Sequence, residues 1–286
     1  MSGQIRHPKS ETGNKFVRVS NVQNRAPRPV LSLWNLNLEF VSDFIGRLLL
    51  LFLSLSPLSS FASSSADVLF RTGVGAFHAG DYSTAATAFW QAAAAHPTSG
   101  TMQNLGLTEW QRGRQGPAIL AWEQALWLNP WNGAARENLR FARKTAQLEA
   151  PELAWYEVVS TWFPVNWWAW VAGLSLWLAI GFVLVPGILR LRKAAWHQAV
   201  AALCLAVFLL SLPALVGVQT RSKLGFVLDK DVPLRLTPTQ EAQAVTRLAA
   251  GEPVRLDRVR GRYFLVHTSR GAGWLEATQF GLTCPH

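Results

Sequence analysis

The chain has 286 residues, of which 50% are apolar and only 15% are charged, and its formal net charge is +10. A charged fraction so far below the ~25% of ordinary soluble domains indicates long uncharged stretches. Much of the positive charge flanks these stretches instead of gathering on one folded segment. This distribution is typical of membrane topology and argues against a nucleic-acid-binding protein.

The N-terminal part is expected to be a leader. Residues 1–47 carry seven Lys and Arg against three acidic residues and are predicted to form a disordered or basic N-terminal extension. Residues 48–66 combine a short Leu- and Phe-rich run with small residues. They predict either a signal peptide, cleaved after Ala66 or Ala62, or an uncleaved signal anchor. Each alternative exports the segments that follow.

An internal repeat with a period of 33 residues occupies the segment 67–148. In each copy, small residues are expected where two helices cross, an aromatic side chain fills the space between them, and a proline ends the second helix. The matched positions are Gly73, Ala85, Phe89, Ala92 and Pro97 in the first copy and Gly106, Ala118, Trp122, Ala125 and Pro130 in the second. The pattern resembles the tetratricopeptide repeat. A capping helix is expected to follow from Asn132.

The concave surface of such a repeat array is where partners usually bind. Four residues of the second copy are candidates to line a short peptide groove there: Gln103, Asn104, Glu109 and Trp110. Because the array has only two copies, this groove is expected to be short.

Two segments are long and apolar enough to cross a bilayer, which takes about 20 residues. Residues 167–189 contain no charge over 23 positions, and residues 199–218 contain none over 20. The linker 149–166 precedes them. Tryptophans gather where the first span begins, as in the aromatic belt of a membrane interface: Trp162, Trp167, Trp168 and Trp170.

The distribution of basic residues predicts the orientation of these two spans. The loop 190–198 contains Arg190, Arg192 and Lys193, whereas residues 150–166 contain neither Lys nor Arg. By the positive-inside rule the loop is cytoplasmic, so that the repeats and the C-terminal domain lie on the extracytoplasmic side of the membrane. The exported leader predicts the same side.

The last segment, 219–286, is predicted to be a small all-β domain. Five short strands separated by turns are expected: Phe226–Leu228, Pro233–Leu236, Val254–Val259, Tyr263–His267 and Gly273–Leu275. About 60 residues suit a closed barrel. The segment resembles the bacterial SH3-like domain in the order and spacing of several motifs. They are Leu234-Arg235 with Pro238, Leu248 with Gly251 and Val254, Gly261 with Tyr263 and Val266, and Gly273-Trp274-Leu275.

Two features of this domain have alternative readings. Tyr263 and Trp274 are candidates to face a peptide ligand, but aromatic residues at such places also pack in the core or at the rim. A basic hairpin either contacts an anionic partner, such as lipid head groups or wall polymer, or is a solvated turn. Its residues are Arg255, Arg258, Arg260 and Arg262.

The sequence contains no motif typical of a catalytic or metal site. The histidines have no partner at metal-ligand spacing, and neither Cys204 nor Cys284 is placed as a nucleophile. No cofactor or metal is therefore expected, and the protein is predicted not to be an enzyme.

The order of modules from about residue 48 resembles the tetratricopeptide membrane proteins of the bacterial aerotolerance (Bat) operons, the BatE type. This resemblance implies a multidomain adaptor with all-α tetratricopeptide repeats, two transmembrane helices and a small all-β SH3-like barrel. It further implies a place in the bacterial inner membrane, with the repeats and the SH3-like domain on the periplasmic side, and partnership with von Willebrand factor A-type membrane proteins and a MoxR-type ATPase in the envelope. A second hypothesis is a module that binds peptidoglycan peptide through the SH3-like domain.

Overall fold

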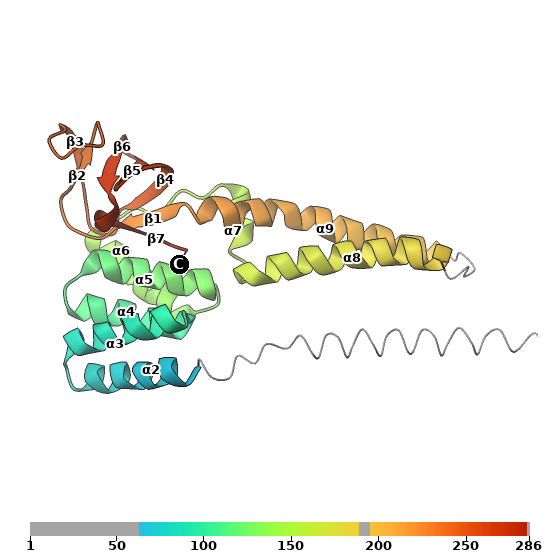
Figure 1. Cartoon of the computed structure of the whole chain (residues 1–286), viewed down its shortest axis with the longest axis horizontal. Coiled ribbons are helices and arrows are strands. Elements are labelled where there is room, and N and C mark those ends of the chain that lie inside the picture. Colours follow the sequence, from blue (N-terminus) through green and yellow to red (C-terminus); the bar gives the residue numbers. More distant parts are fainter. Residues whose placement is uncertain (1–62, 189–194, 285–286) are drawn as a thin grey trace, which may run out of the picture. The chain divides into compact units, whose positions relative to one another are not determined.

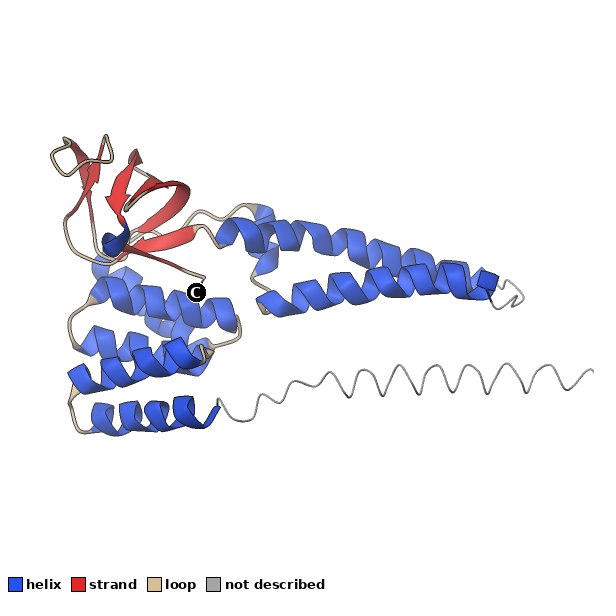
Figure 2. Cartoon of the chain, viewed as in Figure 1, coloured by secondary structure: helices blue, strands red, loops and turns tan. Residues whose placement is uncertain are grey.

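The chain places its helices first and its β-sheet last (Figures 1 and 2). The computed structural model describes residues 63–188 and 195–284, which all belong to the unit Ser59–His286. The N-terminal extension, most of the signal segment and most of the loop 190–198 lie outside the described residues. Ala66, one of the two expected cleavage positions, lies within the first described helix.

Five helices cover most of the repeat segment. They are α2 (Ser63–His78), α3 (Tyr82–Ala95), α4 (Ser99–Gln111), α5 (Gln115–Leu128) and α6 (Gly133–Ala146). Gly80 and Gly113 turn the chain after α2 and α4 with φ angles of 81° and 74°, which a residue with a Cβ adopts at a cost. The Asn132 side chain accepts a hydrogen bond from Ala135 N–H and so caps α6.

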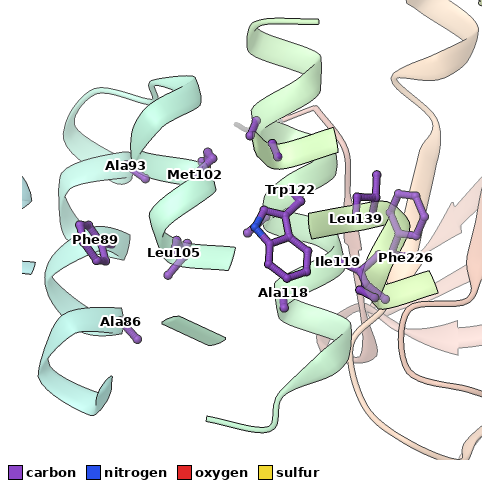
Figure 3. Packing of buried hydrophobic residues seen from close by; sticks show 14 of the residues in the cluster. Ala86, Phe89, Ala93, Met102, Leu105, Ala118, Ile119, Trp122, Leu139 and Phe226 are labelled. Atoms are coloured by element: carbon purple, nitrogen blue, oxygen red, sulfur yellow. The ribbon is translucent and has the colours of Figure 1, made fainter. Parts of the chain in front are cut away.

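The cores of consecutive helices form one continuous cluster (Figure 3). Phe89 and Trp122 are each 1% exposed and fill the middle of the two helix pairs. Leu139 of α6 and Ile119 of α5 close the cluster next to Phe226, which comes from the sheet. The helical part and the sheet therefore bury apolar surface against each other.

Three helices follow in the middle of the chain: α7 (Trp155–Ser160), α8 (Val165–Ile188) and α9 (Ala195–Arg221). The short helix α7 lies within the predicted linker. Helices α8 and α9 run side by side (Figure 1) and are long and apolar enough to cross a membrane. Only 22% and 17% of their apolar windows are buried, whereas a core helix of a soluble protein would be mostly buried. We call α8 and α9 the span-length pair.

The C-terminal domain is a seven-stranded sheet in the order β3-β2-β6-β5-β4-β1-β7, in which neighbouring strands are antiparallel. The strands are β1 (Leu224–Val227), β2 (Val232–Arg235), β3 (Ala244–Leu248), β4 (Pro253–Arg260), β5 (Tyr263–Thr268), β6 (Gly271–Glu276) and β7 (Phe280–Leu282). Its core is apolar and includes Leu234, Val254, Val266 and Leu275. The turn η1 (Ala277–Gln279) precedes β7.

Two of these strands were not predicted from the sequence. Strand β3 is largely exposed, and its residues do not alternate between apolar and polar as those of a half-buried strand do. Strand β7 has three residues with Gly281 in the middle. Both are strands because a neighbour supplies hydrogen bonds: β2 pairs with β3, and β1 pairs with β7.

Candidate functional site

The two glycines of the repeat lie directly against the two large aromatic side chains. A Cβ on Gly73 would lie 2.8 Å from the Phe89 ring, and a Cβ on Gly106 would lie 2.6 Å from Trp122 Nε1. Trp122 Nε1 also donates a hydrogen bond to the carbonyl of Gln103 at 3.2 Å. Glycine is therefore required at both crossings, since any side chain would displace the aromatic ring.

The other repeat positions occupy equivalent places in the two helix pairs. The alanines among them are at most 1% exposed: Ala85, Ala92, Ala118 and Ala125. Pro97 follows the cap of α3, and Pro130 follows the cap of α5. Residues 33 apart thus have the same surroundings, as a structural repeat requires.

Two of the four candidate groove residues are already engaged within the protein. Gln103 Oε1 accepts a hydrogen bond from Asn132 Nδ2 at 3.1 Å. Glu109 is 7% exposed; its Oε1 accepts from Arg112 Nη1 at 3.0 Å, and its Oε2 lies 3.5 Å from Arg114 Nη1, too long for a good hydrogen bond. Both residues therefore hold helices in place, and Glu109 Oε2, which accepts no hydrogen bond from another described residue, is buried. Asn104 is half-buried.

The fourth candidate, Trp110, belongs to an aromatic pair that sequence reasoning missed. Its ring lies 5.9 Å from that of Phe141 on α6, in an edge-to-face arrangement. Trp110 is half-buried, while Phe141 is 61% exposed. An exposed aromatic side chain supported by a second ring is typical of the anchors of protein interfaces. We call Trp110 and Phe141 the aromatic pair.

The two candidates on the sheet differ in exposure. Tyr263 is 7% exposed, its hydroxyl lies 3.4 Å from Glu276 Oε1, and Arg262 lies over its ring at 5.5 Å. Trp274 is half-buried in β6, opposite Arg235 of β2 and Leu265 of β5. The surroundings of Tyr263 are those of a residue that packs at the rim of the domain.

A buried ion pair connects α7 to the sheet. Glu157 of α7 is 1% exposed, and its carboxylate accepts two hydrogen bonds from Arg255 of β4, at 2.6 and 3.1 Å. It also accepts one from Ala154 N–H at 2.9 Å. Burial raises the pKa of Glu157, but the hydrogen bonds from Arg255 and Ala154 outweigh burial, so that this pKa lies below its ordinary value.

The same helix is tied to the span-length pair. Ser160 Oγ accepts a hydrogen bond from Arg221 Nη1 at 3.1 Å, and its carbonyl accepts one from Trp168 Nε1 at 3.2 Å. A Cβ on Gly217 would lie 2.2 Å from the carbonyl oxygen of Tyr156, so α7 crosses α9 in close contact. We call this group of contacts around α7 the junction.

Helix α5 and the sheet approach each other as closely as α7 and α9 do. A Cβ on Gly116 would lie 2.1 Å from the carbonyl oxygen of Leu228, and one on Gly281 would lie 2.3 Å from the Leu120 side chain. Gln124 Nε2 donates to the carbonyl of Leu282 at 2.9 Å. Together with Phe226, these contacts fix the sheet against the last repeat.

Two cavities adjoin the junction. One of about 630 Å³ is lined by residues of both charges, among them Glu149, Glu252, Arg255 and Arg270. The other, of about 490 Å³, is lined mainly by arginines and leucines. Among residues 63–188 and 195–284, no cluster of three or more His, Cys, Asp or Glu is arranged to hold a metal ion.

Comparison with protein-family models, curated proteins and solved structures gave no match in any of the three searches.

Proposed function

We propose that this protein is a non-catalytic, membrane-anchored adaptor that presents tetratricopeptide-type repeats and an SH3-like domain on the extracytoplasmic side. The observation that carries the proposal is the junction. Through Glu157, Arg255, Ser160 and Arg221, the helix α7 is bonded both to the sheet and to the end of the span-length pair. An anchor built in this way holds both binding modules in one orientation.

Rigid coupling suits an adaptor because it lowers the entropy that two partners lose on binding side by side. The sheet contacts α5 through the close approach at Gly116 and through Phe226 in the helical core. If the modules bound independently, a flexible linker of polar residues would serve equally well. The buried contacts instead favour one composite platform.

The aromatic pair is the part of the repeats that best fits a protein partner. Phe141 exposes 61% of its surface on α6, next to Trp110 of α4. A partner that covered these rings would gain apolar burial at little conformational cost, since both side chains already rest on each other. Partner binding is thus assigned to this pair and not to Gln103 or Glu109.

The resemblance to the aerotolerance-operon proteins suggests the class of partner. Von Willebrand factor A-type membrane proteins and a MoxR-type ATPase are the candidates that it implies. The orientation rests on the sequence alone, on Arg190, Arg192 and Lys193 between the two spans. Membrane lipid is the other partner, through the exposed apolar surfaces of α8 and α9.

Crosslinking in intact bacterial membranes, followed by purification of the full chain, tests the adaptor function. We expect defined membrane proteins to be captured by the wild type and capture to fall at least tenfold with Phe141→Ala, because interface anchors contribute about 2 kcal/mol or more. Trp90→Ala is the matched control, since Trp90 is 64% exposed on α3 and outside the aromatic pair.

Two results would contradict the proposal. Equal loss of capture in both variants would mean that the aromatic pair is not the docking surface. Retention of cell-wall material alone, unchanged by Phe141→Ala, would mean that the protein acts as a peptidoglycan-binding module through the sheet.

A further inference from the structure

The smaller of the two cavities at the junction has a strong excess of positive charge. Four arginines and one glutamate line it: Arg136, Arg140 and Arg143 from α6, Arg221 from the end of α9, and Glu123 from α5. The three arginines of α6 follow a spacing of four and three residues, which places them on one face of the helix. Its volume of about 490 Å³ is that of a site for a small molecule or a head group.

Only part of this charge is compensated. Arg143 forms an ion pair with Glu123. Arg221 Nη1 donates to Ser160, and its guanidinium lies 5.1 Å from the centre of the Trp127 ring. Arg136 donates to a backbone carbonyl, and Arg140 forms no hydrogen bond or ion pair with another described residue. Since a guanidinium has five N–H donors, most of those around the cavity remain for a ligand.

Aromatic side chains gather near the start of α8, and two of them, Trp131 and Trp162, are the sequence neighbours of residues that line the cavity. Trp131, the residue before the cap of α6, donates from Nε1 to the carbonyl of Trp162 at 3.1 Å. Its ring lies 6.0 Å from that of Phe163 and 6.4 Å from that of Trp167, near the start of α8. These aromatic residues are exposed and form a belt of the kind found at the head groups of a bilayer.

Two lining residues connect the cavity to this belt. Thr161 is the direct neighbour of Trp162, and Arg221 is the last residue of α9. Arg136 lies in the first turn of α6, which begins at Gly133, two residues after Trp131. With α8 and α9 across a bilayer, the belt would lie at the head groups, and Arg136 and Arg221 would lie near the lipid phosphates.

We propose that this cavity binds the phosphate of an anionic phospholipid from the membrane that α8 and α9 cross. Planar guanidinium groups bind phosphate oxygens with two parallel hydrogen bonds. Arg136 and Arg140 supply such groups from α6, and Arg221 supplies one from the end of α9. Leucines of the lining, including Leu139, offer an apolar surface to the glycerol backbone. This inference rests on the proposed membrane anchoring and names the lipid class that the anchor selects.

The test uses the full chain in a neutral detergent and native mass spectrometry, with phosphatidylglycerol, phosphatidylcholine and inorganic phosphate as separate probes. The cavity variant carries Arg136→Gln and Arg140→Gln. The control variant carries Arg71→Gln and Lys230→Gln, which remove the same charge from exposed positions outside the cavity and outside the basic hairpin. Thermal melting of all three proteins checks that they remain folded.

We expect the wild type to retain phosphatidylglycerol in preference to phosphatidylcholine. The cavity variant should lose about tenfold in affinity for each arginine removed, because each supplies charge-assisted hydrogen bonds, and the control variant should bind as the wild type does. Equal binding of the two lipids, or an equal loss in both variants, would overturn the inference. Inorganic phosphate bound as tightly as the lipid would also overturn it, since the site would then recognise free phosphate.

The adaptor proposal is tested separately by the same variants. The cavity variant should still capture the membrane partners in the crosslinking experiment, because the aromatic pair is unchanged. If the wild type captures its partners but does not prefer phosphatidylglycerol, only the lipid inference is wrong. If the wild type prefers phosphatidylglycerol but captures no membrane protein, only the adaptor proposal is wrong.

Discussion

Removing Arg255 should loosen the attachment of α7 to the sheet. In the substitution Arg255→Met, the Glu157 carboxylate loses two hydrogen bonds, of 2.6 and 3.1 Å, while it stays 1% exposed. Breaking a buried pair from one side costs roughly 3–5 kcal/mol. Because the Arg255 side chain is 36% exposed and Ala154 N–H still bonds Glu157, we expect a smaller cost, about 2 kcal/mol.

Hydrogen exchange measured by mass spectrometry on the full chain in detergent reports this loss locally. Amides of α7 and β4 should exchange about 30-fold faster in Arg255→Met, as follows from 2 kcal/mol of lost opening free energy. Arg258→Met, an exposed neighbour on the same strand, is the matched control and should change little. Unchanged exchange in α7 would refute the view that the ion pair holds the junction together.

The pH dependence of the same exchange provides a second readout. The pKa of Glu157 lies below its ordinary value in the folded protein, so its stabilisation is present above the ordinary pKa and is lost as the pH falls through the folded pKa. Arg255→Met removes the hydrogen bonds and the charge of Arg255, which lower the pKa of Glu157, so this pKa should rise in the variant. The loss of stability on acidification that Glu157 causes should then shrink, while Arg258→Met should keep it.

Three further substitutions test the close contacts. Gly217→Ala should separate α7 from α9 and lower the melting temperature at a cost of roughly 1–3 kcal/mol, whereas Gly173→Ala, with open space around it, should not. Gly116→Ala should speed proteolysis between α5 and the sheet, because its Cβ would overlap backbone atoms that no side-chain rotation can move; unchanged proteolysis would disprove this contact. Asn132→Ala removes the cap of α6 and two side-chain hydrogen bonds to α4, so it should destabilise α6 by about 1–2 kcal/mol. Amide hydrogen exchange in the first turn of α6 should become faster, and an unchanged exchange rate would exclude this role of Asn132.

Part of the candidate site was visible in the sequence. The 33-residue spacing identified Gly73 and Gly106 as small residues at helix crossings, because packing of equivalent helices repeats along the chain. Trp110 was identified by its place in the repeat. Its partner Phe141 lies in the expected capping helix, beyond the two matched copies, and nothing in the sequence shows that its ring reaches Trp110.

Other residues were assigned a role that their surroundings do not favour. Gln103 and Glu109 are polar residues on a helix, and nothing in the sequence shows that Asn132, Arg112 and Arg114 already engage them. The pairing of Glu157 with Arg255 spans 98 positions of the chain. Such pairings depend on how the modules pack, which local patterns do not encode.

The sequence by itself determined the helical first half, the two span-length segments and the β-rich end, because each depends on hydrophobic period, segment length or turn residues along the chain. Only the tertiary structure decided that α7 joins the sheet to the span-length pair and that the arginines of α6 meet Arg221 around one cavity. These arrangements bring together residues that are far apart in the chain. Burial and electrostatic interactions depend on how close residues lie in space, which local sequence patterns do not determine.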